Sequence, residues 1–285
     1  MKIVVFGAGG QLGQCLADSL SEHPDIKFQL LDRSRFDIAS AESYEMLQKK
    51  DVNFLINCAA YTRVDLAETE RDQAHRINVT GPKLLGKYAS EHQLPILHIS
   101  TDYVYGPGSE PLQEQDTIDP VNYYGQTKWE GEEALRQSGA HHIILRTAWL
   151  YSEYGHNFVK TMLTLAESRS VINVVSDQIG SPTYAGDLAS AIVHVSKMTE
   201  NRNDSFSGTF NFANKGAVSW FQFAREILKE KEVEVLPIPT SSYPTPARRP
   251  TYSVLDSGLF ERTFQWEIPH WKESLARCMV RLDPI

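Results

Sequence analysis

Residues 2–13 read KIVVFGAGGQLG, a short apolar run that leads directly into a glycine-rich turn. The mainly apolar residues 2–6 are too few for a helix and are typical of a buried strand. After the turn, Leu12, Leu16 and Leu20 recur at helical spacing. The sequence therefore predicts a strand, a tight glycine turn and a helix at the start of the chain.

The same alternation of strand and helix continues to about residue 150. Further buried strands are predicted at 27–31, 54–58, 95–100 and 142–146. Helices are predicted between them at 41–50, 67–77, 81–92 and 124–138. Strands that alternate with helices over this length indicate a parallel sheet covered on both faces. We therefore expect an α/β fold with a doubly wound, Rossmann-type sheet.

The pattern becomes less regular in the second half, where clusters of serine, asparagine and proline interrupt it. We expect residues 1–150 to form a dinucleotide-binding domain. Residues 151–285 would form mainly a smaller, loop-rich, substrate-binding lobe, with some segments returning to the first domain. Within this lobe, residues 219–229 are predicted to form an amphipathic helix. Its inward face would consist of Trp220, Phe223, Ile227 and Leu228.

Composition excludes several classes of protein. The net charge of −8 and the lack of any lysine-arginine run argue against a nucleic-acid partner. No apolar run reaches the roughly 18 residues that a membrane span needs, and residues 2–6 are too short for a signal peptide, so we expect a cytoplasmic protein. Cys15, Cys58 and Cys278 lie far apart without a CxxC pair, so neither disulfides nor a bound metal are expected.

The glycine-rich turn indicates a dinucleotide site. Gly7, Gly10 and Gly13 have G-x-x-G-x-x-G spacing between a strand and a helix, where a backbone free of side chains can approach a pyrophosphate. The alternative is a tight turn with no ligand. The small residues that follow the third strand, at 58–62, would leave space for the cofactor, or would simply pack closely.

The end of the second strand carries opposing signals for the choice of cofactor. Asp32 lies about 20 residues after the turn, where a carboxylate can bind the ribose 2′-hydroxyl of NAD. Arg33 and Arg35 are near enough to meet the 2′-phosphate of NADP. Asp37 and Ile38 follow and could lie beside the adenine. The choice between NADH and NADPH stays open.

Tyr124 and Lys128 are four residues apart and therefore share one face of the predicted helix. A neighbouring ammonium is expected to lower the pKa of a tyrosine, which could then give a proton to a carbonyl oxygen. Lys128 could also hold the nicotinamide ribose. A YxxxK pattern is also common as a solvated surface pair. Here Thr101, at the end of the preceding strand, would add a hydrogen bond to the developing alkoxide.

At this point the sequence resembles a known family, the dTDP-4-dehydrorhamnose reductases among the extended short-chain dehydrogenases. The matching motifs span nearly the whole chain. They are GQLG at 10–13, AAYT at 59–62 with VD at 64–65 and AE at 67–68, STDYV at 100–104, YGQTK at 124–128, RTAWLY at 146–151, NFVKTM at 157–162, DQIGSPT at 177–183 and PTPARRP at 244–250.

The resemblance implies reduction of the 4-keto group of dTDP-6-deoxy-L-lyxo-4-hexulose to dTDP-L-rhamnose, with NADPH or NADH as hydride donor. It implies that Tyr124 is the proton donor and that Lys128 positions the cofactor. Thr101, Asp102 and Trp149 would contact the sugar, although Trp149 could equally be a core residue. The implied cofactor contacts are Gly10, Gln11, Leu12, Asp32, Asp37, Ile38, Ala60, Tyr61 and Thr62.

The motifs at 157–162 and 244–250 add three substrate-binding candidates. These are Asn157, Arg248 and Arg249, of which the two arginines suit a nucleotide diphosphate because guanidinium groups bind phosphates in bidentate fashion. The alternative for the arginines is a surface loop with ion pairs.

One departure from the family concerns metal binding and assembly. Some members bind Mg²⁺ between two subunits through carboxylates, whereas this sequence has Gln14 and Cys15 after the glycine turn, and Gly186 beside Asp187. A metal-bridged dimer is therefore not expected, and both a monomer and a homodimer stay open. The alternative functions are a reductase of another nucleotide-linked 4-keto-6-deoxy sugar and a non-catalytic, NADP-binding regulatory subunit.

Overall fold

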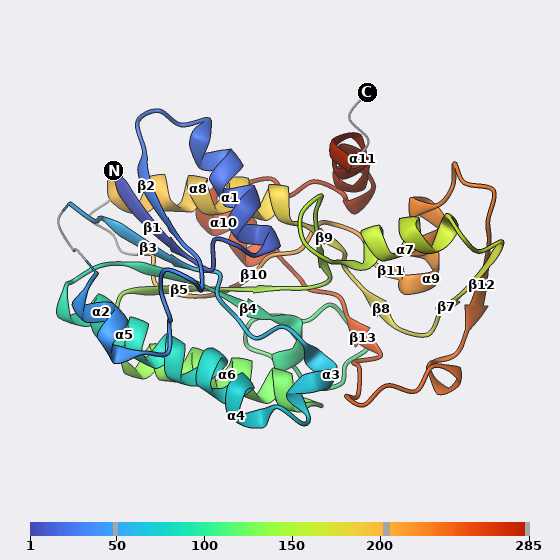
Figure 1. Ribbon diagram of the computed structural model, residues 1–285, viewed down its shortest axis with the longest axis horizontal. Coiled ribbons are helices and arrows are strands. Elements are labelled where there is room, and N and C mark those ends of the chain that lie inside the picture. The colour runs from blue at the N-terminus through green and yellow to red at the C-terminus, as the bar shows by residue number, and fades with distance from the viewer. Residues whose placement is uncertain (48–50, 202–205, 283–285) are drawn as a thin grey trace.

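The structure is a computed structural model that describes residues 1–47, 51–201 and 206–282. Its centre is a sheet of six strands in the order β2-β1-β3-β4-β5-β10, and every neighbouring pair in it is parallel (Figure 1). The strands are β1 (Lys2–Phe6), β2 (Lys27–Leu31), β3 (Phe54–Asn57), β4 (Ile96–Thr101), β5 (His142–Thr147) and β10 (Gly208–Asn211). The predicted doubly wound fold is confirmed, with the ends of β1 to β5 within one residue of those expected. The sixth strand, β10, was not predicted.

The strand order reverses between β1 and β3, which is where such sheets bind ligands. The chain leaves β1 for β2 on one side and then crosses to β3 on the other side of β1. The loops that follow β1 and β3 therefore separate and leave a crevice at the carboxyl ends of the strands. The glycine turn lies in the first of these loops.

Helices cover both faces of the sheet, as Figure 1 shows. The upper layer contains α1 (Gln11–Ser21), α8 (Ala185–Asn201) and α10 (Gly258–Phe264). The lower layer contains α2 (Ala41–Glu45), α5 (Gly81–Glu91) and α6 (Tyr123–Gln137). Each layer has its own apolar core, because the buried parallel strands present aliphatic side chains to both faces. The predicted helix 41–50 is shorter in the structure, and residues 48–50 lie outside the described residues.

The single helix predicted at 67–77 is wrong. The structure has α3 (Val64–Ala67), α4 (Arg71–His75) and a π-helical turn at Arg76–Thr80. Two carboxylates between the helices serve other elements: Glu68 accepts a hydrogen bond from the Tyr123 backbone N–H, at 2.9 Å, and Glu70 accepts one from the Tyr61 hydroxyl, at 2.7 Å. These tertiary contacts account for a break that helical periodicity does not reveal.

The other elements after β5 build a second core around small sheets. They are β6 (Leu150–Tyr151), α7 (Phe158–Ala166), β7 (Val171–Val175), β8 (Ile179–Gly180), β9 (Thr183–Tyr184), β11 (Val218–Ser219), α9 (Trp220–Ile227), β12 (Glu234–Ile238), β13 (Tyr252–Ser253) and α11 (Trp271–Leu282), with a 3-10 turn at Thr240–Ser242. A further 3-10 turn, Asp102–Val104, directly follows β4. The sheets are β12-β7, β11-β8-β13 and β6-β9.

The predicted amphipathic helix is α9. It begins with a capping box, in which Ser219 and Gln222 bond each other's backbone N–H groups. Phe223, Ile227 and Leu228 are buried as predicted, while Trp220 is only partly buried. The helix therefore packs its apolar face into the second core.

Two segments of the second half lie on the central sheet. Strand β10 pairs with β5, and α8 packs along α1. A domain boundary near residue 150 stays a prediction.

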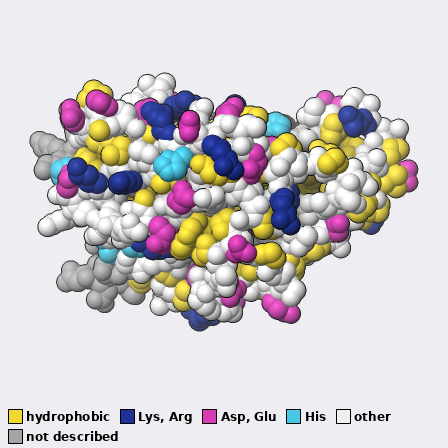
Figure 2. Space-filling view, turned by 90° about the horizontal axis from the view of Figure 1, so that it is seen from below, with side chains coloured by type: hydrophobic (Ala, Val, Ile, Leu, Met, Phe, Trp, Pro, Cys, Tyr) yellow, Lys and Arg dark blue, Asp and Glu magenta, His cyan; other side chains and the backbone are white. Residues whose placement is uncertain are grey.

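Within residues 1–47, 51–201 and 206–282, no helix is long and apolar enough to span a membrane. Figure 2 views the molecule from the side of α4, α5 and α6, and acidic and basic side chains are intermixed over this face.

Candidate active site

The glycine turn packs directly against the end of β3. Gly7 has a φ of +80°, which favours glycine, and a Cβ there would lie 2.5 Å from the Ala59 backbone nitrogen. A Cβ on Gly13 would lie 2.5 Å from the Gly7 carbonyl oxygen. Gly10 is the N-cap of α1, and no side chain caps that helix. The turn is therefore a cradle of bare backbone at a helix N-terminus, which fits the pyrophosphate of a dinucleotide.

Gln11 joins this turn to the second half of the chain. Its amide nitrogen donates to the Leu150 carbonyl at 3.2 Å, and its amide oxygen accepts from Asn157 at 3.4 Å. The Asn157 side chain also donates to the Ser152 carbonyl at 2.7 Å and accepts from the Lys160 N–H, capping α7. The structure thus places Asn157 beside the cofactor cradle with its amide engaged by the protein, and its substrate contact stays a prediction.

The predicted adenosine end lies at the carboxyl end of β2. A Cβ on Gly9 would lie 3.6 Å from the Asp32 Cβ, so Asp32 borders the glycine turn. The Asp32 carboxylate accepts from the Ser34 hydroxyl at 2.6 Å and from two backbone N–H groups, and these bonds lower its pKa. Arg33 and Arg35 are exposed beside it. The end of β2 therefore presents both the carboxylate that favours NADH and the arginines that favour NADPH.

The remaining candidate cofactor contacts differ in how exposed their side chains are and in whether those side chains already have a partner in the chain. Leu12 and Ile38 are buried in the two cores, so only their backbones or edges can face a ligand. Asp37 forms an ion pair with Arg76. Tyr61 is buried, with its hydroxyl on Glu70, while Ala60 is partly buried and Thr62 is exposed.

Tyr124 lies in the first turn of α6, against the end of β4. Asn122 caps the helix by accepting from the Gly125 N–H at 2.8 Å. A Cβ on Gly125 would lie 2.2 Å from the Tyr103 carbonyl oxygen, so this glycine lets the helix approach the turn after β4. The Tyr103 and Tyr124 rings meet edge to face, 5.6 Å apart. The structure therefore brings Tyr124 together with Thr101 and Asp102.

The three polar groups at this point are buried. Thr101 donates to one Asp102 carboxylate oxygen at 2.9 Å, and the other, Oδ2, has no hydrogen-bond partner within the described part of the chain. Burial raises the pKa of Asp102 to about 7, although the nearby Ser253 and Thr101 hydroxyls lower it in part. Burial also raises the pKa of Tyr124, while the adjacent Thr101 hydroxyl lowers it in part. Tyr124 is thus kept as a phenol, the form that can donate a proton.

The expectation that Lys128 lowers the pKa of Tyr124 is wrong for this structure. Lys128 is buried beneath α6, where Nζ donates to the Ile99 carbonyl at 2.7 Å and lies 3.4 Å from His98 Nε2. Burial lowers the pKa of Lys128 to about 8, although the Glu132 carboxylate acts in the opposite direction. The amine is directed at β4, and the burial of Tyr124 dominates that residue's pKa.

Sequence reasoning missed two residues behind Lys128. His98 on β4 and Asn57 on β3 are fully buried, and the Asn57 amide nitrogen lies 2.8 Å from His98 Nδ1. A signal was available, because polar residues interrupt otherwise apolar runs in two strands buried on both faces.

Trp149 and Trp220 form an aromatic wall at the start of the second half. Their rings stack with centroids 3.5 Å apart, and a Cβ on Gly180 would lie 2.5 Å from the Trp149 ring. Trp149 has a φ of +46°, a left-handed conformation that is strained for an aromatic residue. Such strain persists only where surrounding contacts impose it, and it is concentrated at functional sites.

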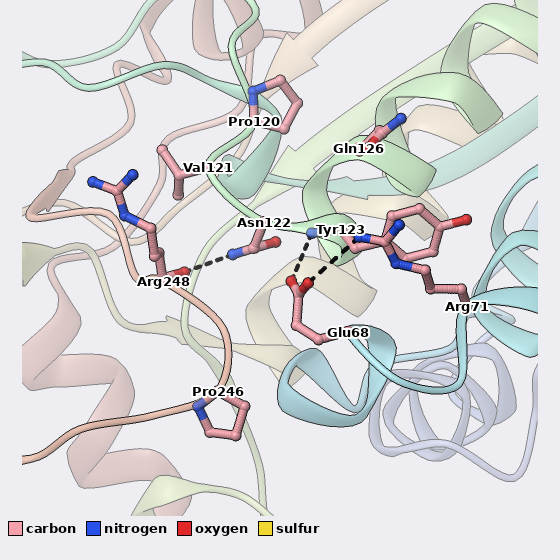
Figure 3. Close-up of a pocket in the computed structure, with 9 residues that line it drawn as sticks. All are labelled: Glu68, Arg71, Pro120, Val121, Asn122, Tyr123, Gln126, Pro246 and Arg248. Atoms are coloured by element: carbon pink, nitrogen blue, oxygen red, sulfur yellow. Dashed lines mark hydrogen bonds and ion pairs between the residues drawn. The ribbon is translucent and has the colours of Figure 1, made fainter.

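A cavity of about 410 Å³ lies where α3, α4 and the start of α6 meet the loop 244–250 (Figure 3). Arg248 lines it, and the Arg248 carbonyl accepts from the Asn122 side chain at 2.8 Å. Arg249 instead forms an ion pair with Asp65 at 2.8 Å, which ties this loop to α3. The other lining residues are Glu68, Arg71, Pro120, Val121, Asn122, Tyr123, Gln126 and Pro246.

The positions compared with the family's metal ligands have partners within the chain. Asp187 pairs with Arg277 and accepts from Asn214 and Ser274, while Cys15 is buried. Among the described residues, no three His, Cys, Asp or Glu side chains form a group that could hold a metal ion.

Comparisons with known proteins agree with this geometry. The family model of the RmlD substrate binding domain matches residues 1–283. A dTDP-4-dehydrorhamnose reductase of Aggregatibacter actinomycetemcomitans is 40% identical over 284 residues, which cover 96% of this chain and 97% of that protein.

Two solved structures are similar over 99% of both chains. A dTDP-4-dehydrorhamnose reductase from Clostridium acetobutylicum has a TM-score of 0.93 at 39% identity. One from Bacillus anthracis, in complex with NADP, has a TM-score of 0.91 at 36% identity. The resemblance seen in the sequence motifs is confirmed, and this chain belongs to the RmlD substrate binding domain family, with the dTDP-4-dehydrorhamnose reductases as its relatives.

Proposed function

We propose that this protein is an NAD(P)H-dependent oxidoreductase that reduces the 4-keto group of dTDP-6-deoxy-L-lyxo-4-hexulose, giving dTDP-L-rhamnose. One observation carries the proposal. In a chain that aligns with such a reductase over 96% of its length, Tyr124 lies buried beside Thr101 at the carboxyl end of β4. Carbonyl reduction needs a proton donor that is protonated at neutral pH, and the raised pKa of Tyr124 meets that need.

The chain's own residues would divide the work as follows. When bound, NADPH or NADH supplies the hydride that reaches the carbonyl carbon. The Tyr124 hydroxyl gives its proton to the carbonyl oxygen, so that the C=O bond becomes a C–H and an O–H bond. Thr101 donates a hydrogen bond to the same oxygen as negative charge develops there. Asp102, whose Oδ2 lacks a partner in the described chain, would bind a sugar hydroxyl.

Binding would draw on both halves of the chain. The bare backbone of the glycine turn would hold the pyrophosphate of the cofactor, and Lys128 would hold its nicotinamide ribose. Trp149 would line the sugar pocket, and Arg248, exposed at the cavity of Figure 3, would meet the substrate diphosphate. Arg33 and Arg35 support NADPH and Asp32 supports NADH, and the NADP complex of the Bacillus anthracis relative favours the phosphorylated form.

We further propose a cytoplasmic enzyme that works as a monomer or a homodimer without a bridging metal. The pairing of Asp187 with Arg277 supports the last point, because a carboxylate held by a guanidinium is poorly placed to bind Mg²⁺.

The test is an assay of NADPH and of NADH oxidation with the dTDP-4-keto sugar made freshly by the preceding enzymes. Turnover that requires the sugar, with rhamnose as the product sugar, is the expected result. Absence of turnover in a folded protein that binds NADP would contradict the proposal and favour a regulatory subunit. A higher kcat/KM with another nucleotide-linked 4-keto-6-deoxy sugar would identify a sister reductase instead.

A further inference from the structure

Two polar side chains face each other inside the central sheet. Asn57 and His98 are register partners across the parallel pair β3 and β4, and their side chains are 0% and 1% exposed. The Asn57 amide nitrogen and His98 Nδ1 are 2.8 Å apart, a contact between side chains in addition to the backbone ladder. Burying polar groups costs free energy unless they are paired, so this pair needs a physical account.

The backbone fixes the orientation of the Asn57 amide. Asn57 Oδ1 accepts the Ala59 backbone N–H at 3.0 Å, so the other amide atom, Nδ2, faces His98 Nδ1. An amide nitrogen only donates, and therefore Nδ1 must be the unprotonated nitrogen of the ring. Burial lowers the pKa of His98 and keeps its ring neutral, and the charge of Lys128, in its ammonium form, and that of Arg136 act in the same direction. The single ring proton is then on Nε2.

That proton is directed at the amine of Lys128. His98 Nε2 lies 3.4 Å from Lys128 Nζ, and Nζ also donates to the Ile99 carbonyl at 2.7 Å. An ammonium group has no lone pair, so it cannot accept from an Nε2–H group. A neutral amine can accept that bond while it still donates to Ile99.

We propose that Asn57 and His98 are a positioning pair for Lys128: Asn57 fixes the His98 proton on Nε2, and that N–H binds Lys128 against β4 when the lysine is a neutral amine. When Lys128 takes up a proton it loses its bond to His98, and the ammonium turns toward the cofactor ribose. This last step rests on the function proposed above, whereas the tautomer and the state of the amine do not.

The other charged and titratable groups around Lys128 and His98 differ in which protonation state they favour. Glu132, on the next turn of α6, favours the ammonium, and Cys58, at the end of β3, lies near enough to do the same in its thiolate form. Burial of the Cys58 thiol raises its pKa and keeps it neutral, so Glu132 alone opposes His98 and the cost of burial. Arg136 faces the imidazole and favours its neutral state.

The test reverses the tautomer by Asn57→Asp. A carboxylate at this position can still accept from the Ala59 N–H, but its second oxygen must accept from His98, which moves the ring proton to Nδ1. His98 Nε2 then accepts from the Lys128 ammonium. The matched control is Asn53→Asp, which makes the same charge change at an exposed position just before β3.

Two measurements need neither substrate nor turnover. The ¹⁵N spectrum of the histidine rings, assigned with a His98→Gln variant, reports the tautomer, and the Lys128 Nζ shift followed against pH reports its protonation. We expect a protonated Nε2 in the wild type, a protonated Nδ1 in Asn57→Asp, and a Lys128 pKa raised in that variant by about one unit or more. Asn53→Asp should leave both unchanged.

A wild-type His98 protonated on Nδ1 would overturn the proposal, and that result needs no variant to fold. A Lys128 titration that is unchanged in both Asn57→Asp and His98→Gln would also overturn it. In the enzyme assay, the pH dependence of the NADPH KM should follow the Lys128 titration while kcat at low pH stays near that of the wild type. If the spectra agree but no turnover is found, the positioning pair stands and the proposed function fails.

Discussion

Helix α6 carries two buried charged side chains one turn apart, and the structure treats them in opposite ways. Glu132 is paired by Arg146 through Nε and a terminal nitrogen, at 3.0 and 2.7 Å, and by Arg136 at 2.7 Å, and it accepts from Ser100. Lys128 contacts one carbonyl and one neutral imidazole, and among the described residues its amine forms no ion pair with a carboxylate. We call Ser100, Glu132, Arg136 and Arg146 the anchor network, and Thr101, Asp102, Tyr124 and Lys128 the reactive group.

This contrast separates the residues that fix α6 on the sheet from the residues that we propose to take part in the reaction. In the anchor network, burial opposes the charge of Glu132, but the bonds to Arg146 outweigh it and lower the carboxyl pKa. In the reactive group the opposing hydrogen bonds and charges are weaker than burial, so burial raises the pKa of Asp102 and lowers that of Lys128. The anchor network fixes α6 on β4 and β5, and the uncompensated groups beside it can change protonation during a reaction.

The largest effect is expected from Tyr124→Phe, which removes the proposed proton donor of the reactive group. Turnover should fall by about two to four orders of magnitude, the usual contribution of general acid catalysis, while NADPH affinity stays near normal. Steady-state kinetics and a cofactor titration measure the two. Tyr88→Phe, on α5 and away from β4, is the control and should keep the wild-type rate. A Tyr124→Phe enzyme with an unchanged kcat would exclude this residue as the proton donor.

The next largest effect is expected in the anchor network, on stability. Glu132→Gln leaves the Arg146 guanidinium buried without a counter-charge, which should lower the free energy of unfolding by about 3 kcal/mol. Denaturant unfolding at neutral pH measures this loss. The control is Glu133→Gln, whose partner is the half-exposed Arg136, and it should cost less than about 1 kcal/mol. Equal losses in the two variants would mean that Glu132 is no more an anchor than a surface residue.

Sequence analysis located β1 to β5 because each is a short, mainly apolar run between turn signals. It did not predict β10, whose sequence GTFN is not such a run and which is a strand because it pairs with β5. It failed at 67–77, where the Glu68 side chain bonds to the Tyr123 backbone on α6 and the Glu70 side chain bonds to Tyr61 before α3, and the helix is interrupted. Helical spacing reports which residues could share a face. It cannot report a carboxylate that is taken by another element.

The candidate site divides in the same way. Tyr124 and Lys128 were predicted from their spacing on one helix, and Thr101 from its position at the end of the preceding strand. Such positions can be recognised because each depends on only a few neighbouring residues in the sequence. The direction of the Lys128 amine was not predicted, since it depends on His98, which is 30 residues away along the chain. Asn157 and Arg249 have partners in Gln11 and Asp65 that only the folded chain brings near.

An effect of similar size, but one that develops only as pH rises, is expected from Asp102→Asn. The folded carboxyl has a pKa of about 7 against 3.8 for the free group, so between these values the native state binds more protons than the unfolded state. The free energy of unfolding of the wild type should therefore fall as pH rises through this window. Because Asn cannot ionise, the variant should gain stability relative to the wild type, on the order of 3 kcal/mol by pH 8.

Thermal unfolding at several pH values from 4 to 8 would measure this difference. The control is Asp119→Asn, which makes the same substitution at an exposed position outside the reactive group. A difference that is constant with pH in Asp102→Asn would show that the folded carboxyl titrates normally. Asp102 would then behave like neither the anchor network nor the reactive group.

The smallest effect is expected from Lys128→Met, and its sign is what separates the two groups. The folded pKa of Lys128, about 8, lies below its ordinary value of 10.5, so the cost of burying the ammonium is fully present below pH 8. That cost is relieved as pH rises from 8 to 10.5, where the unfolded state binds more protons, and wild-type stability should therefore rise over this window. Methionine has a similar length and no charge, so the variant should lack the rise.

At pH 7 we expect Lys128→Met to be more stable than the wild type by about 1–2 kcal/mol, since it removes an uncompensated buried charge. The same change should impair cofactor binding, because the donor to the ribose is lost. Denaturant unfolding without cofactor isolates the effect on stability. A loss of stability similar to that of Glu132→Gln would mean that Lys128 also anchors the helix. A gain would show that α6 gives up stability at Lys128 and recovers it one turn later, at Glu132.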